Sequence, residues 1–271
     1  IKGNATQRGC ELELFQPRKS GNMDCTFCLD CIKACPHENV GIVAVLPGHD
    51  LIEDRPRSSV GRYSTRLDLA ALVLVLTFGA FANAAGMVAP VLAAISKAAS
   101  ALNFSSDLGV VTLLSVLVLM IIPAAMATGA ALWSSAVAGK VLKENLCRFS
   151  LSLVPIGFAM WLAHFTFHFF TAALTPIPVL HRIAHELGVT RAEPVWSVNS
   201  LAFYNLPGFE LFLLDLGLLL SLYVAWRIAG QMGSARRFST FVPWGLLAAS
   251  LYAAGVWIIF QPMEMRGMMM H

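Results

Sequence analysis

Charged residues are scarce in this chain. They make up 13% of its 271 residues, against roughly 25% in a typical soluble domain, and long stretches after residue 66 contain none. Several of these stretches exceed the roughly 18 apolar residues that mark a candidate membrane span. The scarcity of charge therefore excludes an ordinary soluble protein and indicates an integral membrane protein.

Several functional motifs are also missing. The sequence contains no Walker or dinucleotide-binding glycine pattern and no nucleophile–base pair of the hydrolase type. Its net charge of +3 is small, and no basic tract alternates with aromatic residues as in a single-strand binder. We therefore expect neither nucleic-acid binding nor a self-contained catalyst.

Five long apolar runs are what the sequence does contain. They are continuous rather than alternating, which favours helices, because lipid requires a backbone whose hydrogen bonds are satisfied internally. The runs lie at about 67–96, 108–137, 149–174, 207–229 and 240–260. The expected fold is an α-helical membrane protein with a polar module over 1–50, a basic linker over 51–66, a five-helix domain over 67–261 and a Met-rich tail over 262–271.

Lysine and arginine are distributed unequally among the short loops. Most of them fall on the side of residues 1–66, and few fall on the side of the 175–206 loop. By the positive-inside rule, the first side is cytoplasmic. The sequence therefore predicts a multi-pass protein of a bacterial cytoplasmic membrane, with residues 1–50 inside and the C-terminus outside.

Five of the six cysteines lie within the first 35 residues, which is unlike a disulfide framework spread along an extracellular domain. Cys147 stands alone beside a span and is expected to be an inert thiol. The run CTFCLDCIKACP places Cys25, Cys28, Cys31 and Cys35 at the spacing of a bacterial-type [4Fe–4S] site. A zinc knuckle would more often offer two separated cysteine pairs.

The fourth ligand of this cluster has two candidates. In the expected two-cluster arrangement, the last cysteine of the run ligates the other cluster. Cys10 would then complete the site of Cys25, Cys28 and Cys31, and Cys35 would serve a second cluster whose remaining cysteines precede Ile1. In the alternative arrangement, one cluster uses all four closely spaced cysteines and Cys10 is idle.

The stretch GCELELFQPRKSGNMDCTFCLDCIKACPHENVGI resembles membrane-bound polyferredoxin-type 4Fe–4S proteins, distantly related to the NapH and NosR membrane ferredoxins. The segments PIGFAMWLAHFTFHFFTAALTPIPV and FQPMEMRG are similar to the FesM-type branch of that group. The resemblance implies a ferredoxin-like module, a longer N-terminal membrane part and a first cysteine triplet. It also implies electron exchange among quinone pools, cytoplasmic donors and partner redox subunits.

Two histidine pairs have a four-residue spacing, so each pair shares one helical face. His164 and His168 lie in the third span, whereas His181 and His185 lie in HRIAHELG, which reads as a short amphipathic helix on the outer surface. Haem b is one interpretation, with each axial histidine needing a partner on another helix. A second is a metal such as copper, given the Met-rich end with His271. The third is a quinone site or ordinary helix packing.

Asp215 lies in the middle of the fourth span, with Glu210 about one turn nearer the outside. A carboxylate within a membrane is by default a functional candidate. We expect Asp215 to pair with a histidine of the third span in a proton relay, or else to be a neutral acid bonded to backbone.

Two functions follow from these features. The first is an electron-transfer subunit, which passes electrons between cytoplasmic [4Fe–4S] clusters and quinone or another redox partner. Because electrons hop only over short gaps, an acceptor on the outer side would need an intermediate carrier such as haem. The second is a non-catalytic membrane anchor or a maturation factor for a metalloenzyme outside.

Overall fold

The computed structural model describes residues 2–19, 21–46, 48–54, 61–104, 106–197, 205–232 and 234–263. These residues form helices and loops, without a named strand. Five of the helices are long and apolar enough to cross a membrane, which confirms the predicted number of spans. Residues 55–60 of the expected linker and the Met-rich tail after Met263, including His271, lie outside the described residues.

Each span consists of one helix or of several that follow one another directly. The first is α3 (Leu67–Ala85), and the second joins α5 (Leu108–Val116), η3 (Leu117–Ile121) and α6 (Ile122–Ala138). The third joins α7 (Leu142–Ser150), η4 (Leu151–Leu153) and α8 (Val154–Ala172). The last two are α10 (Leu206–Met232) and α11 (Arg237–Ile259).

The first span is shorter than predicted, because α3 ends at Ala85 and not near residue 96. Gly86 caps it, and a separate helix, α4 (Ala89–Ala101), begins with Pro90 in its first turn, where the missing N–H costs nothing. The backbone N–H of Ala89 donates to Pro262 O at 2.9 Å, so the chain near the end of α11 holds this break in place.

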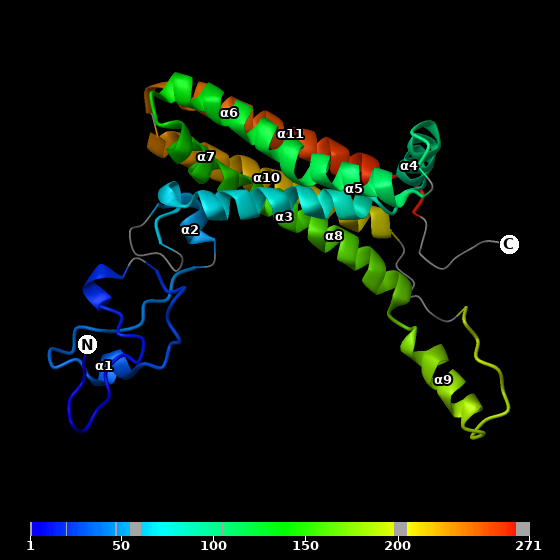
Figure 1. Cartoon of the computed structure of the whole chain (residues 1–271), viewed down its shortest axis with the longest axis horizontal. Helices are drawn as coiled ribbons and strands as arrows, with labels where there is room; N and C mark the ends of the chain where they lie inside the picture. The colour runs from blue at the N-terminus through cyan, green and yellow to red at the C-terminus, as the bar shows by residue number, and fades with distance from the viewer. Residues whose placement is uncertain are drawn as a thin grey trace.

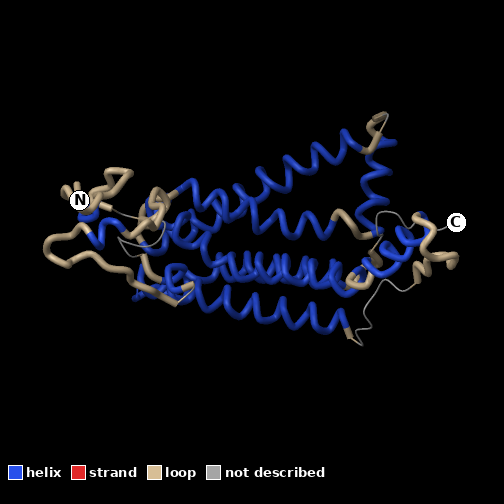
Figure 2. Tube along the Cα trace, turned by 90° about the horizontal axis from the view of Figure 1, so that it is seen from below, coloured by secondary structure: helices blue, strands red, loops and turns tan. Residues whose placement is uncertain are grey.

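The membrane helices lie side by side, with neighbouring helices packed closely (Figures 1 and 2). α10 packs against α8 and α11, α11 against α6, and α3 against α8. Small residues allow the closest approach, since a Cβ added to Gly217 of α10 would lie 2.4 Å from the Cβ of Ala159 of α8. Such small-residue contacts are typical of helices that associate in lipid.

The second span contains a π-helical turn, η3. Pro123 follows it, and proline has no N–H to donate to the carbonyl group of Leu119, four residues earlier. The missing bond accounts for the wider turn, which is a kind of irregularity that often occurs at functional sites.

The two ends of the bundle differ in what they carry (Figures 1 and 2). The N-terminal module lies beyond one end and contains η1 (Gln16–Arg18), α1 (Asp30–Lys33) and loops. Two short helices, α2 (His49–Ile52) and η2 (Tyr63–Thr65), connect it to α3, and η5 (Ser234–Arg236) joins the last two spans. The helix α9 (Pro176–Glu186) extends from the opposite end.

Candidate functional site

The cysteines of the N-terminal module are divided between two environments. Cys10, Cys25, Cys28 and Cys31 line one cavity of about 150 Å³, whereas Cys35 does not line it. The cavity is the space between the loop after Cys10, the cysteine run and the extended segment 40–43. The four cysteines that the two-cluster arrangement assigns to one cluster therefore line the same cavity.

The backbone between the cysteines adopts a conformation that is uncommon for side-chain-bearing residues. Phe27 has a φ of 55° and Leu29 a φ of 68°. Both values lie in the left-handed region, which non-glycine residues enter rarely and often near functional sites. These two residues flank Cys28, so they turn the chain sharply on both sides of the central thiol of the run.

Two further features hold the walls of the cavity together. α1 begins directly after Leu29 and carries Cys31. Gln7 donates from Nε2 to Oδ1 of Asp30 in this helix at 3.3 Å, which links the segment before Cys10 to the cysteine run. Cys10 thus reaches the cavity from a segment that is distant in sequence.

Hydrogen-bond donors lie close to two of the module's thiols, those of Cys25 and Cys35. The pKa of Cys25 lies below its ordinary value, first because the backbone N–H of Phe27 donates to it and also because Lys19 lies close. The pKa of Cys35 is also lowered, chiefly by the backbone N–H of Asn39, which donates to Sγ at 3.4 Å. Such donors favour the thiolate, which is the form that binds metal.

Within the described parts of the chain, no three His, Cys, Asp or Glu side chains lie close enough to hold one metal ion. A cubane instead takes one thiolate on each of its irons, so its ligands stand further apart than those around a single zinc ion. The cavity is lined by four free cysteines, the residue type and number that a [4Fe–4S] cluster requires.

His164 and His168 are brought together on α8. Their Nε2 atoms lie 3.2 Å apart, and their rings are nearly perpendicular, with centroids 4.6 Å apart. His164 is 4% exposed, and its Nδ1 is buried without a hydrogen-bond partner. The two rings therefore bond to each other through the nitrogens that would otherwise be free to ligate haem iron.

The second histidine pair lies elsewhere. His181 is half-buried and His185 exposed on α9, which extends beyond the end of α8 (Figure 1). Arg182 of the same helix donates from Nε to Oε1 of Glu186 at 2.8 Å. The structure shows the predicted short amphipathic helix, with the apolar residues Ile177, Leu180 and Ile183 exposed.

The intramembrane carboxylates differ from the expectation. Asp215 is exposed on the surface of α10 and accepts a hydrogen bond from Oη of Tyr252 at 2.6 Å, rather than from a histidine of the third span. Glu210 is the buried carboxylate. It is 3% exposed, and its Oε1 has no hydrogen-bond partner. Five residues rotate a helix by about 140°, so the two carboxylates lie on different faces. Positions 210, 214, 217 and 221 form the buried stripe, and their spacing is the signal that identifies Glu210.

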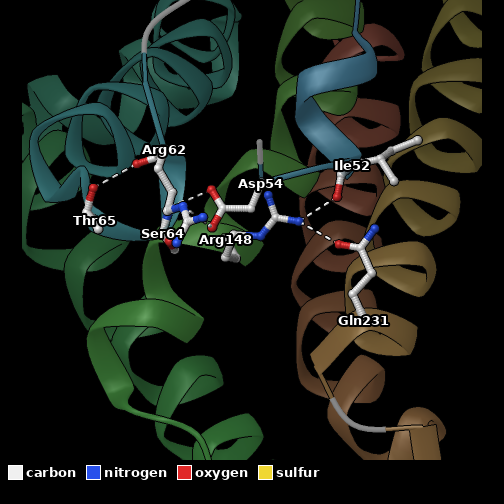
Figure 3. A network of polar contacts seen from close by, with 7 residues as sticks. All are labelled: Ile52, Asp54, Arg62, Ser64, Thr65, Arg148 and Gln231. Atoms are coloured by element: carbon white, nitrogen blue, oxygen red, sulfur yellow. Dashed lines mark hydrogen bonds and ion pairs between the residues drawn. The ribbon is translucent and has the colours of Figure 1, made fainter. Parts of the chain in front are cut away.

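A buried arginine ties the segment that connects the module with α3 to the bundle (Figure 3). Arg148 of α7 is 3% exposed, and its Nη2 donates to the carbonyl oxygen of Ile52 and to Oε1 of Gln231 at 2.8 Å. Nearby, Asp54 accepts from the backbone N–H of Ser64 at 3.2 Å. Sequence reasoning treated this stretch as a polar linker, but Ile52 also packs against the core.

Comparisons with models of protein families, with curated proteins and with solved structures find no match to this chain.

Proposed function

We propose that this protein is a membrane-bound electron-transfer subunit of the polyferredoxin type. A [4Fe–4S] cluster would be held by Cys10, Cys25, Cys28 and Cys31, and when bound it would supply one-electron transfer. The observation that carries the proposal is that these four thiols line one cavity. The described membrane helices support a role at the bilayer rather than in free solution.

Cys35 has a separate role in this proposal. Its thiol does not line the cavity, and backbone N–H groups favour its thiolate form. It would ligate a second cluster, with the remaining ligands supplied by another cysteine-bearing segment. The module would lie on the cytoplasmic side, and the electrons would pass to or from quinone or a partner redox subunit.

The test is anaerobic purification and cluster reconstitution of the full chain, followed by iron analysis and electron paramagnetic resonance of the dithionite-reduced protein. Cys10→Ser and Cys28→Ser should each lose the signal of the first cluster. Cys35→Ser should keep it, and Cys147→Ser serves as the control, because Cys147 is buried in α7 away from the cavity.

The alternative assignments give different results. Retention of the signal in Cys10→Ser together with its loss in Cys35→Ser would show that the four closely spaced cysteines share one cluster. Binding of stoichiometric zinc, with no iron signal under any reducing condition, would overturn the electron-transfer function.

A further inference from the structure

An apolar groove runs along the lipid-facing side of the bundle between α3 and α8. Its volume is about 650 Å³, and most of its lining residues are aliphatic or aromatic. Leu119 of the π-helical turn closes one side, so the irregularity of the second span contributes to the groove. Pockets of about this size accommodate small organic ligands.

The polar groups of the groove gather toward one end. Thr77 of α3 lies directly beside Gly157 of α8. These two positions therefore lie at the same level along their two helices. His164 lies seven residues after Gly157, about 10 Å further along the helix at 1.5 Å per residue. Asn83 lies six residues after Thr77 on α3. The side chains of Asn83 and His164 therefore line the groove at nearly the same level. Apart from Thr77, the groove is therefore lined mostly by apolar residues, with Asn83 and His164 toward the end remote from the module.

His164 has an unused hydrogen-bonding atom at this end. Its ring is 4% exposed and lines the groove, and its Nδ1 is buried without a partner. Leaving such an atom unsatisfied is a cost, because the buried nitrogen gives up its hydrogen bonds to water. A ligand with an oxygen at this depth would remove that cost, whereas a saturated acyl chain would not.

Aromatic side chains line the same stretch of the groove. Phe158, Trp161 and Phe165 follow each other along α8, with the rings of Trp161 and Phe165 at a centroid distance of 4.7 Å. Each is exposed. Flat aromatic faces favour a planar ring over a flexible chain.

We propose that this groove binds an isoprenoid quinone, with a ring oxygen at Nδ1 of His164 and the tail along the apolar remainder. The ligand class follows from three requirements: entry from lipid, a planar ring, and an oxygen at the level of His164. The inference rests on the proposed function for the use of the bound quinone, whose exchange of electrons with the distant cluster would need an intermediate carrier, but binding does not require the cluster.

The pair of histidines lets one site bind both forms of the ligand. If Nε2 of His164 accepts from Nε2 of His168, Nδ1 of His164 carries the proton and donates to a quinone carbonyl oxygen. If Nε2 of His164 donates instead, Nδ1 accepts from a quinol hydroxyl group. The 3.2 Å contact allows either tautomer, so His168 acts as a positioning residue for His164.

The experiment is a titration of the full chain in detergent with decylubiquinone, followed through quenching of Trp161 fluorescence, with Trp161→Phe identifying the reporter. We expect saturable quenching that weakens about tenfold in His164→Leu, as for one buried hydrogen bond. Gly79→Leu should also weaken it, because Gly79 lines the groove and an added Cβ has only Leu119 within 4 Å, at 3.7 Å. Gly129→Leu is the matched control on another lipid-facing surface, with nothing within 4 Å.

Two amide substitutions separate binding from folding. The amide of His164→Asn lies near the position of Nδ1 and should keep most of the affinity, whereas that of His164→Gln lies near Nε2 and should not. Equal affinities in all variants, or equal displacement by decanol, would overturn the proposal. Cys28→Ser should bind decylubiquinone normally while it loses iron, so failure of the cluster and failure of the quinone site are distinguishable.

Discussion

Cys35 is distinguished from the other module cysteines by its position and by its hydrogen bonds. In cluster-free protein, the lowered pKa of Cys35 means that a larger fraction of the thiol is ionised at a given pH. Because only the thiolate reacts with iodoacetamide, we predict that alkylation of Cys35 reaches its half-maximal rate at a lower pH in folded than in urea-denatured apoprotein. Mass spectrometry of the labelled peptide measures this rate.

The control for this prediction changes one backbone donor. Asn39→Pro removes the N–H that donates to Sγ, so it should shift the half-maximal pH upward, whereas Asn39→Ala keeps the N–H and should leave it unchanged. An upward shift of the same size in both variants would show that the asparagine side chain, or local folding, is responsible.

At single positions, the sequence indicates which residues are candidates for a site better than it indicates which way their side chains face. The four cysteines singled out by the spacing of the run and by the placement of Cys10 line one cavity, and their role as ligands stays a prediction. Asp215 was expected to pair with a histidine of the third span but accepts from Tyr252, because hydropathy alone does not say which face of an apolar helix packs inward. Glu210 shares its face with Gly217 and Ser221, and the small side chains of that face were the missed indication.

At the scale of helices, α8 and α10 approach each other closely at Gly217. In Gly217→Ala the new methyl group would lie 2.4 Å from the Cβ of Ala159 and 3.1 Å from the carbonyl oxygen of Pro155. We predict a loss of about 1–3 kcal/mol from overpacking, seen as a lower midpoint of thermal unfolding in detergent.

The matched substitution, Gly129→Ala, should instead raise the midpoint of thermal unfolding. Gly129→Ala places its methyl group where no atom lies within 4 Å, and alanine is favoured over glycine in a helix by up to about 1 kcal/mol. An unfolding midpoint that falls equally in both variants would contradict close packing at Gly217 as the cause.

The number of spans was predictable, but their ends were less so. Long apolar runs indicate helices because lipid satisfies no backbone groups. The end of α3 depends on Gly86 and on a hydrogen bond from Ala89 to Pro262, at the far end of the chain. A contact between segments so distant in sequence cannot be inferred from local hydropathy, so the first span was predicted to continue to residue 96.

At the scale of the whole molecule, Arg148 joins the segment between the module and α3 to α10 (Figure 3). We predict that Arg148→Met loosens the segment around Ile52, because the carbonyl oxygen of Ile52 and the amide oxygen of Gln231 lose their shared donor at a cost of about 1–3 kcal/mol. Trypsin cleavage after Arg62, followed by mass spectrometry, should become about tenfold faster or more.

Lys143→Met provides the control for this prediction. Lys143 is an exposed cation on the same helix, α7, so its removal changes the charge without changing these contacts. Equal acceleration of cleavage in both variants would show that charge near the linker, and not the buried hydrogen bonds of Arg148, holds the segment in place.

The cysteine cavity and the polar end of the α3–α8 groove lie toward opposite ends of the bundle. An electron passed between them by way of an intermediate carrier would cross most of the apolar layer and would therefore be driven or opposed by the voltage across the membrane. Moving one charge through that voltage corresponds to about 2.3 kcal/mol per 100 mV. Such an arrangement would make the direction of flow depend on how strongly the cell's membrane is energised.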